Sequence, residues 1–157
     1  GATTQALGVL TGVMYQDSVR KQPVWLDYWP GSGAVSVDTN HPVRAYVADN
    51  PNQLFQVSSD ASLTNRATAV AAIFANTDLG TSARTGSTDT GKSNSEASVA
   101  NIAATATLPL RIVGIVDDDA NSDYTAAGIP LIVRLNAHFN AGTRRFDSQT
   151  TADSTGL

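Results

Sequence analysis

The segments Leu108-Pro-Leu-Arg-Ile-Val-Gly-Ile-Val116 and Ile129-Pro-Leu-Ile-Val-Arg-Leu-Asn-Ala-His-Phe139 decide the fold of this chain. In the second segment apolar residues occupy every other position, namely Leu131, Val133, Leu135, Ala137 and Phe139. This period of two is typical of a strand with one face on a core and a mostly polar outer face. The first segment is apolar on both faces except at Arg111, as expected of a central strand. The linker Asp117–Asp123 is rich in turn-forming residues, so the two segments are predicted to form a long antiparallel hairpin.

The composition limits the classes of protein to which the chain can belong. Its 157 residues fit a single β domain over residues 1–139, followed over residues 140–157 by a polar tail without structure of its own. The absence of cysteine excludes disulfides and thiolate metal sites. The net charge of −4 and the scarcity of lysine argue against a nucleic-acid partner. No apolar run approaches the roughly 18 residues that a membrane-spanning helix needs.

Further strands are predicted towards the N-terminus. Leu7–Tyr15 alternates like a strand, in which Gly8 and Gly12 mark bulges or the close approach of another backbone. A second hairpin is predicted from Val43–Val47 and Leu54–Val57, with a turn between them that contains an Asn-Pro pair.

The middle of the chain has weaker patterns. Ala61–Phe74 is ambiguous: a short helix is predicted near Ser62–Thr68, with Asp60 as a possible cap and no helix beyond Phe74, but Val70–Ala75 could equally form a strand. Asn76–Ser98 is too long and polar for an ordinary connection, and Val99–Ala104 is expected to add a short strand. Together the patterns predict an all-β protein, either an antiparallel β-barrel or a jelly-roll-like sandwich, with long loops and at most one short helix.

The segment Gly86-Ser-Thr-Asp-Thr-Gly-Lys-Ser93 satisfies the P-loop pattern, with Lys92 for a phosphate and Asp117 downstream for magnesium. A P-loop must follow a buried strand and open a helix, and neither is predicted here. The match is therefore interpreted as an exposed loop.

Oxygen-bearing side chains alternate in the turn at Asp117, Asp119, Asn121 and Asp123, as in a calcium loop. The glycine and glutamate that an EF-hand requires are missing, so a solvated turn is predicted. The two histidines, His41 and His138, are both predicted to lie on the surface. No metal site, cofactor site or catalytic group is therefore predicted.

Trp25, Tyr28 and Trp29 form the candidate protein interface. Packing in the core or at its rim is the default expectation for Trp25. Trp29 is followed by Pro30 and a glycine-rich loop, which makes it the candidate for an exposed anchor of the kind enriched at protein interfaces.

Four segments together carry a resemblance to a known family. They are Leu7–Tyr15 with Trp29-Pro30 after it, Ala45–Pro51 leading to Leu54–Val57, Ala106–Val116, and Leu131–His138. In this order they resemble small head proteins of tailed bacteriophages, of the capsid cement or decoration type. The resemblance extends over most of Leu7–Phe139. Family members carry a further segment before the position of Leu7, so the resemblance leaves open whether one precedes Gly1.

The resemblance implies a virion structural protein with a β-barrel or jelly-roll-like body and no enzymatic activity. Such a protein is made in the host cytoplasm and sits on the outer capsid surface as a homo-oligomer, a dimer or a trimer. It binds the major capsid protein and clamps neighbouring coat subunits, with neither nucleic acid nor membrane as a partner. The polar segments Asn76–Ser98 and Asn140–Leu157 are expected to become ordered on that partner.

Two other classes of function remain open. One is a small nucleotide-binding enzyme that uses Lys92 and Asp117, and the other is a carbohydrate- or receptor-binding β-module that uses the aromatic residues of Trp25–Trp29. The order of the strands in the sheet tests the first class, and the exposure of the aromatic side chains to solvent tests the second.

Overall fold

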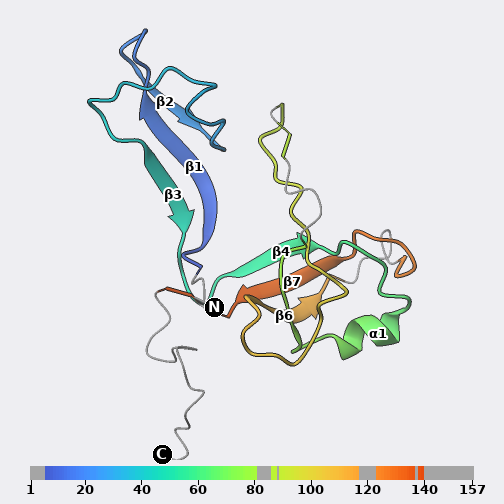
Figure 1. Ribbon diagram of the computed structural model, residues 1–157. Coiled ribbons are helices and arrows are strands. Elements are labelled where there is room, and N and C mark those ends of the chain that lie inside the picture. The colour runs from blue at the N-terminus through green and yellow to red at the C-terminus, as the bar shows by residue number, and fades with distance from the viewer. Residues whose placement is uncertain (1–5, 81–85, 88, 117–122, 137, 140–157) are drawn as a thin grey trace, which may run out of the picture.

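The computed structural model of the chain describes residues 6–80, 86–87, 89–116, 123–136 and 138–139. Its strands form two antiparallel sheets, one of three strands in the order β2-β1-β3 and one of four in the order β4-β7-β6-β5 (Figure 1). We term the three-stranded sheet with its loops the arm, and the four-stranded sheet with helix α1 the body. The elements are β1 (Val9–Gln16), β2 (Pro23–Leu26), β3 (Arg44–Ala48), β4 (Leu54–Ser58), α1 (Arg66–Ala71), β5 (Asn76–Thr77), β6 (Leu110–Ile115) and β7 (Pro130–Leu135).

The predicted hairpin forms the centre of the body. β6 and β7 pair antiparallel, with Ile112 opposite Val133. Leu131 and Val133 are 0% and 2% exposed, which confirms the predicted core face of β7 at these two positions. The prediction fails at Phe139, which is 66% exposed and lies beyond the end of the strand, while Ala137 lies outside the described residues.

Helix α1 is packed on the body through small side chains. It lies in the predicted region, and its buried Ala69 belongs to the same apolar core as β6 and β7. The cap is Asn65, whose side chain accepts the backbone N–H of Thr68 at 2.9 Å. Asp60, the predicted cap, instead accepts the N–H of Val99 at 2.8 Å and so holds a loop against the body.

The hairpin predicted from Val43–Val47 and Leu54–Val57 is wrong, because β3 pairs with β1 and β4 pairs with β7. The turn itself forms, since the carbonyl of Asn50 accepts a backbone N–H three residues on. It passes the chain from the arm to the body. There Phe55 and Val57 pack against the core, so apolar burial beside β7 outweighs closure of the local hairpin.

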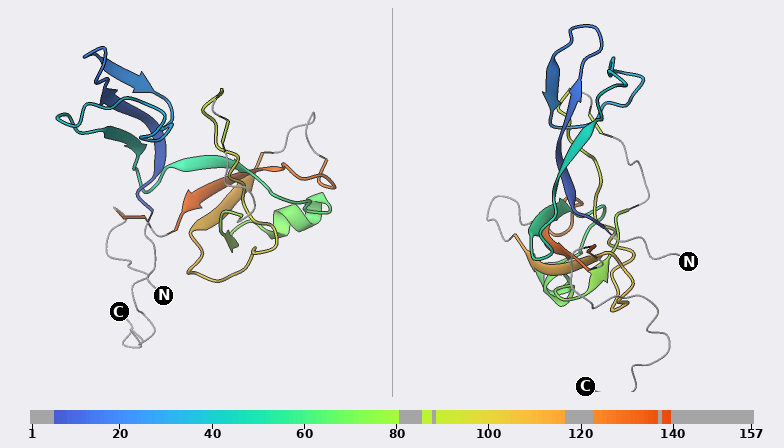
Figure 2. Two further views of the ribbon diagram at one scale, coloured as in Figure 1. Left: turned by 45° about the horizontal axis from the view of Figure 1, so that its top comes forward. Right: turned by 90° about the vertical axis from the view of Figure 1, so that its left-hand side faces the viewer.

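The arm has a small core of its own. Val13 and Tyr15 of β1 are 2% and 6% exposed, whereas the extended body core contains neither. A Cβ on Gly8 would lie 2.0 Å from the carbonyl oxygen of Ala48, which confirms the predicted close approach of another backbone. Figure 2 shows that the arm rises away from the body in both views, with the segment around residues 86–93 rising beside it.

The all-β class with antiparallel sheets, long loops and one short helix is confirmed for the described residues. The described strands form two sheets and no closed barrel, so the architecture is consistent with the predicted alternative of a β-sandwich. The strand predicted at Val99–Ala104 is wrong, because this segment forms turns and a single bridge between Asn76 and Ala103. The tail 140–157 and the turn residues 117–122 lie outside the described residues.

Candidate interaction surface

One face of the arm carries an exposed aromatic pair built over Gly12. In the register of the sheet Gly12 is opposite Tyr46 of β3, and the next residue on the same face, Met14, is opposite Trp25 of β2. The rings of Trp25 and Tyr46 meet with their centroids 4.6 Å apart. A Cβ on Gly12 would lie 2.3 Å from Cζ2 of Trp25, so the missing side chain makes room for the indole. The expectation that Trp25 packs in or at the rim of the core is wrong, because Trp25 is 54% exposed and Tyr46 is 41% exposed.

Trp29 lies on the opposite face of the arm. Its ring meets Tyr15 edge-on, with a centroid distance of 6.1 Å and an interplanar angle of 78°. Tyr15 follows Met14, and successive strand residues point to opposite faces, so Trp29 and Trp25 are on different sides of the sheet. Trp29 and Tyr28 are both half-buried. The structure therefore makes Trp25 the more exposed of the two tryptophans.

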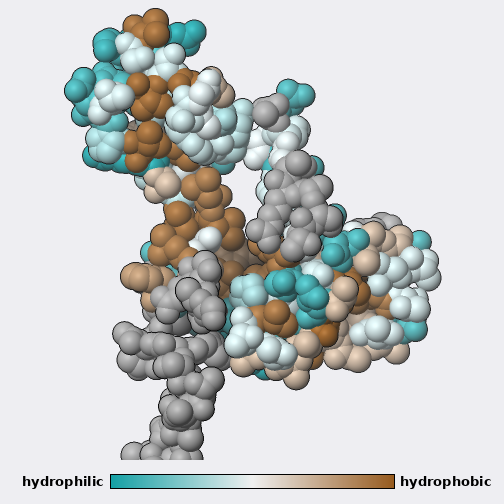
Figure 3. Space-filling model, viewed as in Figure 1, coloured by the Kyte–Doolittle hydropathy of each residue, from teal (hydrophilic) through white to brown (hydrophobic). Residues whose placement is uncertain are grey.

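Exposed apolar residues gather on the arm and at its base. Each of the following is at least 41% exposed: Leu7, Val9, Leu10, Val19, Trp25, Val43 and Tyr46. Figure 3 shows hydrophobic residues, in brown, along the arm and down to its junction with the body. Scattered exposed apolar residues are ordinary, but Trp25 and Tyr46 also lie in contact with each other, which makes this pair the candidate interaction surface. Sequence reasoning missed Tyr46, and it attributed Gly12 to a bulge or to another backbone, whereas the close neighbour of Gly12 is the ring of Trp25.

A buried carboxylate fixes the loop that leads into β3. Asp38 is 7% exposed, and its carboxylate accepts the backbone N–H of Asn40 at 3.0 Å and a hydrogen bond from Nζ of Lys21 at 3.2 Å. These donors, Asn40 first and then Lys21, hold the pKa of the Asp38 carboxyl below its usual value. Nδ1 of His41 lies 3.7 Å from Oδ2 of Asp38, and the His41 side chain is 61% exposed, as predicted for a surface histidine.

The segment Gly86–Ser93 folds back on itself at the tip of its loop. Gly86 and Ser93 form an antiparallel bridge, the N–H of Ser87 donates to the carbonyl of Lys92 at 3.0 Å, and the N–H of Gly91 donates to the carbonyl of Ser87 at 2.8 Å. A P-loop instead presents its N–H groups to a phosphate between a strand and a helix. The N–H groups of Thr90 and Lys92 also donate to hydroxyl oxygens within the segment, so four of these groups are used inside the turn. Lys92 is exposed.

The prediction of a surface position for His138 is wrong, because this residue is 4% exposed. Its backbone bridges to that of Ala6, and the N–H of Phe139 donates to the carbonyl of Ala6 at 2.9 Å. The chain just before β1 therefore pairs with the segment that follows β7. In the part of the chain that the structure describes, no three His, Asp or Glu side chains gather as metal ligands.

The candidate calcium loop is only partly described. Asp117, Asp119 and Asn121 lie outside the described residues. The carboxylate of Asp123 accepts both the hydroxyl and the backbone N–H of Thr125, which lower the pKa of Asp123 in that order of strength. This carboxylate thus caps a local turn.

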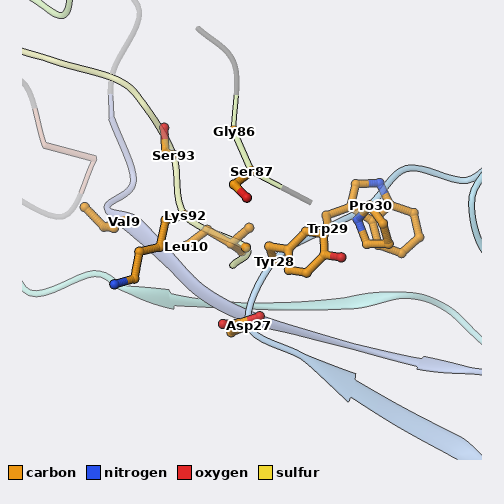
Figure 4. A pocket seen from close by; sticks show the side chains of 11 residues that line it. Val9, Leu10, Asp27, Tyr28, Trp29, Pro30, Gly86, Ser87, Lys92 and Ser93 are labelled. Atoms are coloured by element: carbon orange, nitrogen blue, oxygen red, sulfur yellow. The ribbon is translucent and has the colours of Figure 1, made fainter. Parts of the chain in front are cut away.

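A cavity of about 650 Å³ lies between the arm and the loop tip (Figure 4). Its walls are the start of β1, the residues Asp27–Pro30 that follow β2, and the segment Gly86–Ser93. Two of the three candidate interface residues, Tyr28 and Trp29, line this cavity, whereas Trp25 lies outside it. The candidate residues thus divide between two separate surfaces of the arm.

Comparisons with protein families, with curated proteins and with solved structures gave no match. Within the described ranges no helix is long and apolar enough to cross a membrane.

Proposed function

We propose that the protein is a virion structural protein of the capsid decoration type, which binds the outer surface of a phage head and clamps neighbouring coat subunits. The exposed aromatic face of the arm is the observation that carries this proposal. Trp25 and Tyr46 present their rings to solvent at 54% and 41% exposure on a sheet that stands away from the body. Aromatic side chains of this kind dominate binding energy in protein interfaces. The resemblance of the four sequence segments adds the viral context.

The partner in this proposal is the major capsid protein, and the protein itself forms a homo-oligomer, a dimer or a trimer. A sequence pI near 4.8 disfavours packaged nucleic acid as the partner, and the proposal involves no membrane. The stabilisation follows mass action, because a ligand that binds only the assembled shell shifts the equilibrium away from opening. No catalytic group has a part in this mechanism.

The alternative of a nucleotide-binding enzyme has weaker support. Parallel strands joined by helical crossovers are the usual setting of a P-loop, whereas the named strands here pair antiparallel. The loop tip also uses the N–H groups of Ser87 and Gly91 internally. The third class is a binding module for a receptor or a carbohydrate. The exposure of Trp25 is compatible with such a module, and the cavity lined by Tyr28 and Trp29 offers it a binding site.

The test compares phage heads assembled with and without this protein. We expect the protein to co-sediment with intact heads and to raise the temperature at which they open. A variant that lacks residues 140–157 shows whether the tail contributes to the contact. Heads of equal heat stability to which the protein never binds would contradict the proposal.

A further inference from the structure

Two aromatic side chains, Tyr28 and Trp29, line the cavity between the arm and the loop tip. The ring of Trp29 is held edge-on by Tyr15 at 6.1 Å. The ring of Tyr28 is held by the loop, because a Cβ on Gly91 would lie 2.5 Å from Cδ1 of the tyrosine. Both aromatic side chains therefore have a neighbour within the chain that limits their rotation before any ligand arrives, which lowers the entropic cost of binding.

The polar groups around these rings carry no net charge. Asp27 and Lys92 both line the cavity and are exposed, and within the described residues neither forms an ion pair. Their opposite charges cancel, so the cavity favours neither an anion nor a cation. Ser87 accepts the N–H of Thr90 at 3.2 Å through its hydroxyl oxygen, and its own hydrogen remains available for donation. Figure 4 shows this hydroxyl on the side of the loop that faces Tyr28.

We propose that this cavity binds a neutral saccharide. A pyranose has an apolar C–H face that fits against an aromatic ring and a rim of hydroxyls that both donate and accept hydrogen bonds. Asp27 accepts from such hydroxyls, while Ser87 and Lys92 donate to them. The volume of about 650 Å³ lies within the range of about 300–1,000 Å³ found for small-molecule sites. This inference is independent of the capsid proposal, because it uses the face of the arm opposite to Trp25.

The test uses the fluorescence of Trp29. The chain has two tryptophans, so the variant Trp25→Phe leaves Trp29 as the single reporter in the cavity wall. This variant is titrated with maltohexaose, cellohexaose and N-acetylchitohexaose. We expect a saturable change of emission with at least one of them, at a dissociation constant on the order of 1 mM for such an open site.

Two further substitutions and a control locate the binding in the cavity. Asp27→Asn should weaken binding about tenfold because it replaces a charged acceptor by a neutral one. Ser87→Phe should weaken binding more strongly because it removes the hydroxyl and its larger ring takes up space in the cavity, whereas Asp89→Asn, an exposed acid on the same loop tip that does not line the cavity, should leave binding unchanged. Circular dichroism verifies the fold of each variant, and if Ser87→Phe fails to fold, Asp27→Asn decides.

The inference is overturned if none of the three sugars gives a saturable change, or if Asp27→Asn and Ser87→Phe leave the dissociation constant unchanged. A response to an uncharged hexapeptide of alternating alanine and serine, without a response to the sugars, would overturn it in favour of a polypeptide ligand. Binding to phage heads is measured separately, so a failure here leaves the capsid proposal unaffected.

Discussion

The substitution Trp25→Ala is the sharpest test of the proposed docking face. A tryptophan side chain buries up to about 250 Å² when it is fully covered. With 54% of Trp25 exposed, a partner could cover somewhat more than half of that area. At about 25 cal/mol per Å², complete coverage would contribute roughly 3 kcal/mol as an upper limit. Imperfect pairing and the ordering of side chains at interfaces reduce this figure. We therefore expect Trp25→Ala to lose about 2 kcal/mol of binding free energy, which corresponds to a dissociation constant about 30-fold higher.

The assay is the co-sedimentation of purified protein with heads that lack it, over a range of protein concentrations. The matched control is Phe74→Ala, because Phe74 is a large apolar residue of the body that is 67% exposed. Its ring is contacted by Arg111 at 5.7 Å and lies outside the arm, so this variant should bind like the wild type. Trp25→Ala also removes the part of the indole that the arm already covers, worth up to about 3 kcal/mol at the same coefficient, and the ring contact with Tyr46, worth about 0.5–1.5 kcal/mol more, so circular dichroism must verify that the variant is folded. If folded Trp25→Ala binds heads within twofold of the wild type, or if Phe74→Ala weakens binding equally, the aromatic face is not the docking site.

Three further substitutions test the fold and the loop tip. Leu131→Ala should lower the free energy of unfolding by about 2–5 kcal/mol because the side chain is fully buried, whereas Leu54→Ala on the adjacent strand, at 50% exposure, should lower it by less than about 1 kcal/mol. Equal losses in thermal melts of the two variants would contradict the position of the core. The pKa of Asp38 is depressed in the fold, so its contribution to stability is present above its usual value of 3.8 and is lost as the pH falls through the lower folded value. Asp38→Asn should therefore flatten the fall of stability with acid in urea unfolding, and an unchanged slope would refute the role of this carboxylate. Lys92→Ala should change the free energy of unfolding by no more than about 0.5 kcal/mol and leave head binding unchanged, because the lysine is exposed. Magnesium-dependent binding of ATP that is lost in this variant would show that the tip is a phosphate site after all.

The β6–β7 hairpin could be predicted from the sequence because the patterns that specify it lie within the hairpin itself. The alternation around Leu131 and Val133 fixes which face of β7 is buried, and the turn residues fix where the chain reverses. The helix was likewise located by its apolar spacing, although the capping residue turned out to be Asn65 and not Asp60. Helix and strand periods are properties of neighbouring residues, so they are visible before any tertiary contact is known.

The choice of strand partners could not be predicted in the same way. β4 had a suitable turn before it and a nearby strand in β3, yet it pairs with β7, about 75 residues further on. The energy that decides this pairing is the burial of Phe55 and Val57 in the core, a property of the assembled sheet. His138 illustrates the same limit, because its place on the polar face of the predicted strand gave no sign that it would be buried beyond the end of β7, where its backbone bridges to that of Ala6.

The sequence located the aromatic segment of the candidate interface, but it did not show which tryptophan would be exposed, because that depends on the space above Gly12. The sequence placed both tryptophans in one short segment without indicating to which side of a sheet each would turn. Gly12 decides this, because the gap that it leaves in β1 accommodates the indole of Trp25 and brings it to Tyr46 from the far strand. Cross-strand contacts of this kind depend on the register, which a single sequence does not specify.

The proposed docking face lies on the arm, whereas most of the apolar core lies in the body. The arm buries only two apolar side chains of its own, Val13 and Tyr15, among its described residues. Its order is reinforced by polar contacts, such as those of Asp38 with Asn40 and Lys21, that hold the loop leading into β3. A three-stranded sheet with so small a core is marginal alone, and the body supplies most of the apolar burial that keeps the chain folded. The aromatic pair can therefore stay exposed without cost to the main core, and because its rings are already in contact, a partner has little left to order on binding.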